Sequence, residues 1–378
     1  MNITKANGKN EYELIENLKK RSGETDEKIV EAVEAYADKL ASAVINSVKE
    51  QGDEAVREFT ARFDGIVPRK TVIEKDELNS YLDCVDEDFK NAIIKAKNNI
   101  YDFHLRQAQQ SWMTTKENGV IMGQRIRGLH RVGIYVPGGT AAYPSSVLMN
   151  AIPAKIAGVK EIIMVPPPGK DGNPNPDIMA AAAVAGVDRV FLVGGAQAVA
   201  ALAFGTEKIP KVDKIVGPGN IFVATAKKLL YGVVDIDMIA GPSEILIVAD
   251  KSAKASFLAA DLMSQHDVRA SAILLTTSAE LARATAREID RQIKYLERQE
   301  IIEKSLNDYG EIIVCENLDQ AIDFANELAP EHLEMCVEEP LKYIGRLDNA
   351  GSVFLGNFSP EPLGDYFAGP NHVLPTSG

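Results

Sequence analysis

The sequence predicts an α/β protein made of two Rossmann-like, doubly wound units, with a helical region at the N-terminus. Two observations lead to this fold class. From Arg131 onward, short apolar strands alternate with helical patterns. Two similar segments, beginning at Ala157 and Ala185, are separated by a plausible length for one helix–strand unit. Such alternation is typical of a parallel sheet with crossover helices.

The N-terminal region is predicted to be mostly helical. Apolar positions recur at helical spacing over residues 26–64, with a break at Gly52, and again over residues 86–112. Apolar side chains that repeat three or four positions apart mark one face of a helix. We therefore predict two long helical stretches before the alternation of strands and helices begins.

Residues 129–236 are predicted to form one Rossmann-like domain. Its apolar strands end in turns rich in proline or glycine, and the segments between them have a helical pattern. The strands are expected to begin near residues 131, 160, 188 and 214, with helices over residues 145–158, 175–186 and 196–205.

The α/β pattern continues after residue 236. Strands are expected over residues 244–250, 270–278, 311–317 and 350–356, and helices over residues 257–265, 279–299 and 318–330. Pro330 marks a helix boundary, because the residue before a proline is biased away from helical backbone. We expect residues 1–128 to pack with residues 237–378 as one discontinuous α/β domain.

Charge and composition exclude several classes of function. The formal net charge is −13 and no run of Lys and Arg stands out, so neither nucleic acid nor a membrane surface is an expected partner. No apolar run approaches the ~20 residues of a spanning helix, and the polar N-terminus is not a signal peptide. The three cysteines form no CxxC pair. We therefore expect a cytoplasmic protein without disulfides.

Glycine-rich turns follow several of the expected strands. They contain Gly138 and Gly139, Gly194 and Gly195, Gly217 and Gly219, and Gly241. In open α/β sheets, ligands bind beyond the carboxyl ends of the strands, and glycine lets the backbone approach them closely. The dinucleotide fingerprint G-x-G-x-x-G is not met, because Phe222 stands where its third glycine should be. A ligand site and ordinary tight turns therefore remain alternatives of equal weight.

Histidine is scarce, and three of the five histidines lie in the last third of the chain. They occur in the runs SQHD, PEHLE and GDYFAGPNH, as His266, His332 and His372. Histidine and carboxylate side chains suit zinc, and an amide oxygen can complete such a site. None of these runs has the spacing of a local zinc motif. The histidines are therefore either ligands gathered from separate loops or satisfied structural residues. Ser243 lacks a nucleophile elbow, which disfavours acyl transfer.

Several segments together resemble the histidinol dehydrogenase family. They cover residues 131–159, 193–228, 237–250, 329–334 and 349–378, and residues 52–64 are similar to the N-terminal region of that family. The resemblance covers nearly the whole chain in order. It implies a zinc enzyme that oxidises L-histidinol to L-histidine in two NAD-dependent steps through L-histidinaldehyde. It also implies a homodimer whose active site is shared between subunits, and an NAD-binding role for residues 129–236.

The resemblance assigns roles to individual residues. It makes Glu331 and His332 catalytic, with His332 taking the substrate hydroxyl proton and Glu331 activating water for the aldehyde step. The cofactor-binding residues are Tyr135, Gln197 and Asn220. The substrate-binding residues are Ser243, Gln265, His266, His332, Asp365 and His372. The zinc ligands are Gln265, His266 and Asp365.

The sequence departs from the family pattern at two places. Members of the family read Ser-Gln-Ala-Glu-His-Asp where this chain reads SQHD, so Gln265 and His266 are adjacent instead of three apart. On a helix, adjacent residues point about 100° apart, whereas residues three apart share a face. The C-terminal tail of the family, with a further histidine ligand and a substrate-binding glutamate, is absent from this sequence. Two alternatives are therefore an NAD-dependent dehydrogenase of another small polar alcohol, and an inactive or truncated small-molecule-binding form.

Overall fold

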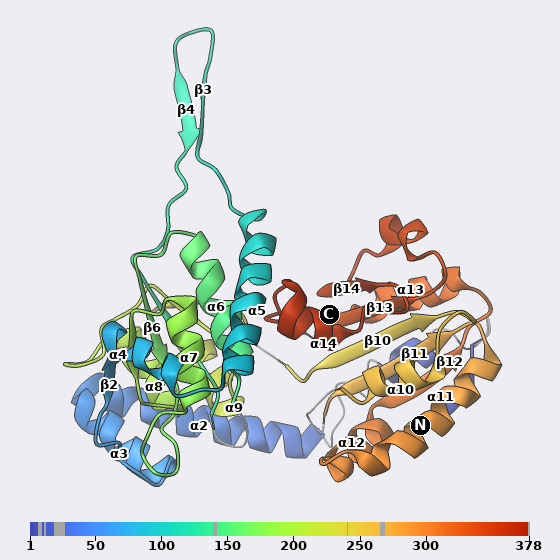
Figure 1. The fold of residues 1–378 in the computed structure, drawn as a ribbon, viewed down its shortest axis with the longest axis horizontal. Coiled ribbons are helices and arrows are strands. Elements are labelled where there is room, and N and C mark those ends of the chain that lie inside the picture. The colour runs from blue at the N-terminus through green and yellow to red at the C-terminus, as the bar shows by residue number, and fades with distance from the viewer. Residues whose placement is uncertain are drawn as a thin grey trace. The chain divides into compact units, whose positions relative to one another are not determined.

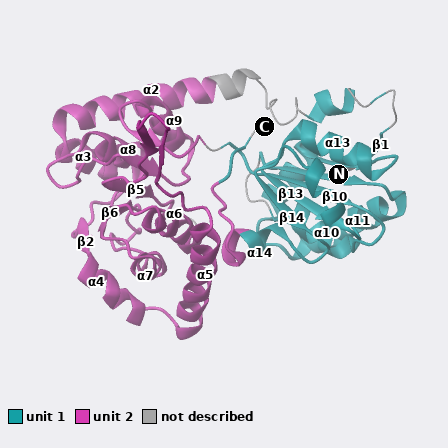
Figure 2. Ribbon diagram, turned by 90° about the horizontal axis from the view of Figure 1, so that it is seen from above, with its two compact units in different colours: residues 1–31, 240–364, 374–378 teal, residues 32–239, 365–373 magenta. Residues whose placement is uncertain are grey.

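The computed structural model describes residues 1–6, 10, 13–18, 27–138, 142–239, 241–264 and 269–376 (Figure 1). The chain divides into two compact units, which Figure 2 shows in different colours. The first unit comprises Met1–Glu31, Ala240–Gly364 and Leu374–Gly378, and the second comprises Ala32–Ile239 and Asp365–Val373. Each unit therefore combines segments that are distant in the sequence.

The first unit is a six-stranded parallel sheet with helices on both faces. The strands lie in the order β1-β12-β11-β10-β13-β14, and every neighbouring pair is parallel. Its described elements are β1 (Asn2–Lys5), β10 (Glu244–Ala249), α10 (Ala255–Leu262), β11 (Ser271–Thr276), α11 (Ala279–Gln292), α12 (Gln299–Asp308), β12 (Gly310–Val314), α13 (Leu318–Leu328), β13 (His332–Cys336), β14 (Ser352–Leu355) and α14 (Glu361–Leu363).

Alternate residues of each central strand face opposite cores. Ile245 and Ile247 of β10 pack with Leu258 of α10 on one face of the sheet. Leu246 of β10 packs with Phe324 of α13 on the other face. Strands that are buried on both faces appear in the sequence as continuous apolar runs, which is why this part of the fold is predictable.

The second unit also contains a six-stranded sheet, in the order β2-β7-β6-β5-β8-β9. The edge strand β2 is antiparallel to β7, and the other neighbours are parallel. Its elements, counting α2 from Ala32, are α2 (Glu27–Gln51), α3 (Asp53–Phe63), β2 (Val72–Glu74), α4 (Lys75–Ser80), α5 (Glu87–Leu105), β3 (Trp112–Thr115), β4 (Ile121–Gln124), β5 (Arg131–Tyr135), α6 (Pro144–Ile156), β6 (Glu161–Val165), α7 (Pro176–Ala185), β7 (Arg189–Phe191), α8 (Gly195–Phe204), β8 (Lys214–Val216), α9 (Ile221–Leu230) and β9 (Asp235–Ile236).

The two sheets share one strand order. When the edge strands β1 and β2 are left out, five strands remain in each sheet. Numbered by their order along the chain, the five strands lie side by side in the order 3-2-1-4-5 in both sheets. This is the order of a doubly wound fold, in which a ligand crevice forms between the first and fourth strands at their carboxyl ends. The predicted α/β class with two doubly wound units is therefore confirmed.

Asp250 follows β10 and lies where the crevice of the first unit would form. The backbone N–H of Asp250 donates to the carbonyl of Cys336 at the end of β13, at 3.3 Å. Its carboxylate accepts hydrogen bonds from the backbone N–H groups of Ser252, at 2.8 Å, and Glu338, at 3.0 Å. An acidic side chain therefore stands beside the position where a doubly wound fold would bind an anionic ligand.

The helices of the N-terminal region pack onto the second sheet. Phe59 of α3 joins Leu202 of α8 in the core on one face, and Ile100 of α5 joins Met149 of α6 on the other. The structure thus groups residues 32–128 with the second unit, whereas the sequence analysis groups residues 1–128 with residues 237–378. Helical periodicity identifies an apolar face but does not tell which sheet that face covers.

The N-terminal region also contains strands that the sequence does not predict. Strand β1 pairs with β12, and β2 pairs with β7. Strands β3 and β4 form an antiparallel hairpin that projects from the second unit (Figure 1). All of its residues are exposed, including Met113 and Ile121, whose relative exposures are 79% and 64%. None of the described helices is long and apolar enough to cross a membrane.

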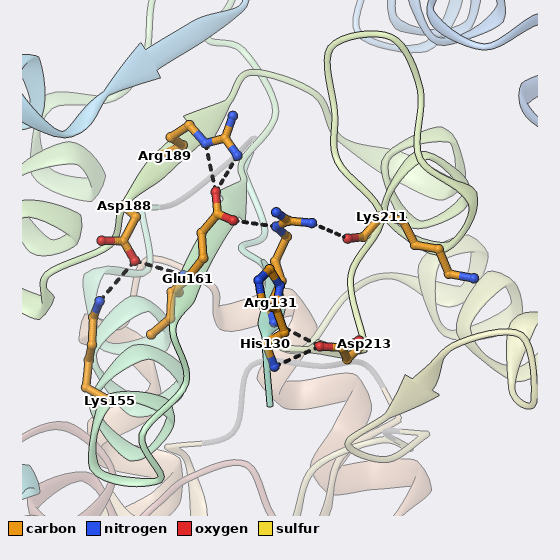
Figure 3. A network of polar contacts seen from close by, with 9 residues as sticks. His130, Arg131, Lys155, Glu161, Asp188, Arg189, Lys211 and Asp213 are labelled. Carbon is orange, nitrogen blue, oxygen red and sulfur yellow. Dashed lines mark hydrogen bonds and ion pairs between the residues drawn. The ribbon is translucent and has the colours of Figure 1, made fainter. Parts of the chain in front are cut away.

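Ion pairs join the amino ends of three neighbouring strands in the second unit (Figure 3). The Glu161 carboxylate accepts a hydrogen bond from Arg131 Nε at 2.6 Å and others from Arg189. The Asp188 carboxylate accepts one from Lys155 Nζ at 3.0 Å. Burial alone would raise the pKa of Glu161, but the hydrogen bonds from the two arginines outweigh this effect and lower it. Charge pairing thus stabilises the sheet edge opposite the ligand crevice.

Candidate active site

The Glu331–His332 pair opens strand β13. Helix α13 ends at Leu328, and Ala329 caps it with φ of 46° in the left-handed region. A residue with a Cβ is rarely found there, so the tight turn is held by its surroundings. His332 then pairs with Ile245 of β10. Glu331 and His332 are 7% and 3% exposed, so the pair is a buried strand start and not a solvated turn.

Glu244, the first residue of β10, positions this pair. The backbone N–H of Glu244 donates to Glu331 Oε2 at 3.1 Å, and the backbone N–H of Glu331 donates to Glu244 Oε2 at 3.2 Å. His332 Nδ1 lies 3.1 Å from the carbonyl oxygen of Glu244. A carbonyl only accepts hydrogen bonds, so Nδ1 is the donor and Nε2 carries the lone pair when the ring is neutral. The sequence analysis missed Glu244, although it follows the expected site residue Ser243.

Three side chains lie close enough together to hold a metal ion. His332, Glu361 and Asp365 each offer a ligand atom, and these atoms lie within 4.8 Å of one another. Asp365 follows Gly364, with which the segment Ala240–Gly364 of the first unit ends, on one continuous helical turn that spans Gly364–Ala368. A histidine nitrogen with two carboxylates is a donor set that suits zinc. Gln265 and His266, the other expected zinc ligands, lie outside the described residues.

Buried carboxyl groups surround Glu361. Its backbone N–H donates to Glu334 Oε1 at 2.7 Å, and its Oε2 accepts a hydrogen bond from Ser264 Oγ at 3.0 Å. Burial raises the pKa of Glu334, and the neighbouring acid Asp261 raises it further; burial also raises the pKa of Asp261. A proton shared between Glu334 and Asp261 lowers the negative charge beside the candidate metal ligands. Sequence reasoning missed Glu361, although its spacing of four from Asp365 places both on one helical face.

The two remaining expected substrate residues flank these groups in the chain. Ser243 directly precedes Glu244, and its carbonyl accepts a hydrogen bond from the backbone N–H of Ser271 at 3.1 Å. His372 belongs to the second unit, where its Nδ1 lies 3.0 Å from the carbonyl oxygen of Asp365. Its ring meets Tyr366 edge to face, at 6.2 Å between ring centres. His372 is therefore fixed next to the candidate ligand Asp365.

The expected cofactor residues stand at the carboxyl edge of the second sheet. Tyr135 ends β5, and its hydroxyl accepts a hydrogen bond from the backbone N–H of Gly195 at 3.2 Å. Gly195 has a φ of 65° and begins α8. Asn220 caps α9, with its Oδ1 accepting from the backbone N–H groups of the first turn at 3.1 and 3.2 Å. These residues therefore follow β5, β7 and β8, around the crevice that a doubly wound fold offers to a ligand.

Gln197 is a buried polar residue of this crevice whose side-chain amide lacks hydrogen-bond partners among the described residues. Its side chain is 1% exposed. Neither its Nε2 nor its Oε1 has a hydrogen-bond partner among the described residues. Leaving a buried donor and a buried acceptor unpaired costs about 1–3 kcal/mol each. A ligand that supplies both an acceptor and a donor, as a dinucleotide does, would satisfy this amide.

Comparison with known proteins adds independent evidence. The family model described as histidinol dehydrogenase matches residues 27–378. Histidinol dehydrogenase of Clostridium acetobutylicum is 54% identical over 96% of this chain and 83% of its own length. That of Caldanaerobacter subterraneus subsp. tengcongensis is 56% identical over 90% and 80%. The crystal structure of histidinol dehydrogenase from Elizabethkingia anophelis aligns with a TM-score of 0.86 and 39% identity, over 90% of this chain and 79% of that one.

The match extends from the helices of the second unit to the last strand of the first. It includes the buried Glu331–His332 pair and the residues around the second crevice. The chain therefore belongs to the histidinol dehydrogenase family, NAD-linked oxidoreductases of histidine biosynthesis.

Proposed function

We propose that this chain oxidises L-histidinol to L-histidine through L-histidinaldehyde, with NAD and zinc as cofactors. The proposal rests above all on the buried Glu331–His332 pair, whose strand start also brings His332 close to Glu361 and Asp365. A proton acceptor, a second acid–base group and candidate metal ligands are thereby gathered around one substrate position. This combination suits the removal of hydride and proton from an alcohol.

The residues present fit the two cofactors. Asp365 is proposed as a zinc ligand together with Gln265 and His266, and Glu361 is close enough to join them. Tyr135, Gln197 and Asn220 are proposed to contact NAD, since the buried Gln197 amide needs a partner. When bound, zinc would hold the imidazole and amine of the substrate, and NAD would accept the hydride.

His332 is proposed to act as the general base in the alcohol step. Its Nδ1 donor is directed to the carbonyl oxygen of Glu244, so Nε2 is the nitrogen that accepts the hydroxyl proton. Loss of that proton and of a hydride converts the alcohol to the aldehyde. The fixed ring orientation means that little reorganisation is needed when the proton moves.

Glu331 is proposed to serve the aldehyde step. The aldehyde must add water before a second hydride can leave, and Glu331 removes a proton from that water. The backbone N–H of Glu244 donates to the Glu331 carboxylate and so fixes its position. His332 then takes the proton of the hydrated aldehyde as the carboxylic acid forms.

The remaining assignments concern binding and assembly. Ser243, Gln265, His266, His332, Asp365 and His372 are proposed to contact L-histidinol. Residues 129–236 are proposed as the NAD-binding domain, and the protein is proposed to form a homodimer with an active site shared between subunits. The exposed apolar side chains of the β3–β4 hairpin support association. The absence of a disulfide at Cys84, Cys315 and Cys336, all among the described residues, supports a cytoplasmic location.

The proposal is tested by substrate choice and by stoichiometry. Zinc-loaded protein is supplied with NAD and either L-histidinol or L-phenylalaninol, an amino alcohol without the imidazole. We expect two NADH for each L-histidine formed and little NADH with phenylalaninol. Equal rates with both alcohols would point to a dehydrogenase of another small polar alcohol. No turnover of either alcohol would contradict the enzymatic assignment.

A further inference from the structure

Asp64, at the end of α3, occupies a position that is unfavourable for an acid. It caps the helix C-terminus, where the helix dipole disfavours negative charge. Its Oδ2 atom is buried and has no hydrogen-bond partner among the described residues. Burial also raises the pKa of its carboxyl group. A half-buried carboxylate with one buried, unpaired oxygen weakens the fold, so its presence points to a role outside folding.

Asp64 ends the helix that packs beside the expected cofactor residues of the second unit. Helix α3 contacts α8, and Phe59 of α3 shares one core with Tyr135. In keeping with this placement, burial raises the pKa of the Tyr135 phenol, and the charge of Asp64 raises it further. The hydroxyl of Tyr135 in turn accepts the backbone N–H of Gly195. The carboxylate therefore stands near the half of the carboxyl edge that is formed by β5, β6 and β7. Asn220, at the end of β8, marks the other half.

The position that usually carries an acidic residue in a dinucleotide-binding crevice is taken by a proline here. In dinucleotide-binding folds, an Asp or Glu reads the 2′-hydroxyl of the adenosine ribose and stands beyond the second strand. That strand is β6, which ends at Val165 and is followed by Pro166, Pro167 and Pro168. Pro167 fills this place, since a Cβ on Gly138 or Gly194 would lie 2.4 or 2.7 Å from its ring atoms.

We propose that Asp64 takes over this role and makes the crevice selective for NAD over NADP. An ionised carboxylate only accepts hydrogen bonds, so it matches the ribose 2′-hydroxyl. The same charge repels the 2′-phosphate of NADP. The ribose hydroxyl would also give the buried Oδ2 atom the donor that the described residues do not provide. This inference rests on the proposed use of NAD.

The first test uses the unaltered protein. Calorimetric titration of the zinc-loaded protein compares NAD, NADP and 2′-deoxy-NAD. We expect NAD to bind roughly 100-fold more tightly than NADP, because opposing a phosphate to a carboxylate is strongly unfavourable. We expect 2′-deoxy-NAD to bind about tenfold more weakly than NAD, because it leaves the carboxylate without its donor. Equal affinity for NAD and 2′-deoxy-NAD would overturn the inference.

The second test removes the charge. Asp64→Asn and Asp64→Ser are compared with Glu58→Gln, which neutralises an exposed acid on the same helix. Both Asp64 variants should lower the preference for NAD over NADP by about tenfold or more, mainly through tighter binding of NADP. Glu58→Gln should keep the preference of the wild type. The ratio of kcat/KM for the two nucleotides should follow the binding ratio.

Two further results separate the possible failures. Thermal melts report folding, and the Asp64 variants should melt no lower than the wild type, because they remove an uncompensated buried charge. If the wild type binds NAD and a folded Asp64 variant keeps the same preference, the role of Asp64 is refuted while the proposed function stands. If the wild type binds neither nucleotide, the proposed use of NAD fails and this inference fails with it.

Discussion

Glu331 is the residue whose replacement best separates the two oxidation steps. Glu331→Gln keeps the shape of the side chain and can still accept the backbone N–H of Glu244. It cannot take a proton from water, so we expect the aldehyde step to slow by about 10²–10⁴ while the alcohol step is much less affected. Supplying L-histidinaldehyde and measuring L-histidine formation isolates the affected step.

The control for this variant is Glu338→Gln, which makes the same change on an exposed residue that follows β13. It should convert the aldehyde at the rate of the wild type. Undiminished conversion by Glu331→Gln would remove Glu331 from the water-activating role.

His332 could serve as a base or as a metal ligand, and one pair of variants separates these roles. If it is the base, His332→Asn should lower both oxidation steps by about 10²–10⁴ and still bind zinc. Asp365→Asn should instead lose zinc, as metal analysis of the purified proteins would show. Loss of zinc from His332→Asn would assign His332 to the metal, and near-normal turnover would dismiss it as the base.

The ion pairs at the amino ends of β5, β6 and β7 give a pH dependence at the level of an element. The fold lowers the pKa of Glu161, so its pairing stabilises the sheet above the usual glutamate pKa. That contribution is lost as the pH falls through the lowered value. Glu161→Gln should therefore cost about 1–3 kcal/mol near neutral pH, because Arg131 and Arg189 lose a charged acceptor.

Urea unfolding from about pH 7 down to about pH 3 would measure this effect. The difference between Glu161→Gln and the wild type should narrow as Glu161 itself becomes neutral. Glu58→Gln serves again as the control and should track the wild type throughout. A difference that does not change with pH would show that the lost stability comes from packing and not from the charge.

Elements built from continuous apolar runs were predictable from the sequence, and so was their order. Strands β10, β11 and β12 are buried on both faces, so their sequences differ clearly from those of the charged helices α11 and α12, which lie between β11 and β12. The repeat noted at Ala157 and Ala185 corresponds to the ends of α6 and α7 followed by β6 and β7. Strand β1 was not predictable, because a four-residue strand at a sheet edge depends on its partner and not on its own pattern.

The parts of the site that depend on distant pairing were also hidden. Glu244 meets Glu331 only because β10 and β13 are neighbours, although the residues are 87 positions apart. Phe59 of α3 shares a core with Tyr135 only because α3 packs against α8, which brings the end of α3 to this side of the sheet. The Glu331–His332 pair, in contrast, is adjacent in the chain and follows a proline, so sequence reasoning could identify it.

The projecting hairpin gives a prediction for the assembly of the whole molecule. Residues 106–129 carry more Lys and Arg than Asp and Glu, while the whole chain has a net charge of −13. We propose that this basic arm, with its exposed apolar side chains, contacts a second copy of the same acidic chain in the proposed dimer. Ile121→Asp should then lower the dimer affinity by about 10–100-fold, because it places a charge in the proposed contact.

Sedimentation analysis over a range of concentrations would measure this effect. Asn118→Asp is a matched control at the tip of the hairpin, where aspartate can still accept the N–H of Val120. It adds the same charge without replacing an apolar side chain, so it should dimerise like the wild type. Unchanged dimerisation of Ile121→Asp would place the contact elsewhere.

The strand order shared by the two units has a consequence for stoichiometry. A protein that repeats a nucleotide-binding architecture could be expected to take up two cofactor molecules per chain. Here a hydrogen-bonded acid, Asp250, stands at one of the two crevices, and the buried amide of Gln197, which has no partner among the described residues, lies at the other. Saturating the protein with NAD should therefore require one equivalent per chain. One of the two similar units would bind the cofactor, and the other would serve only a structural role at its crevice.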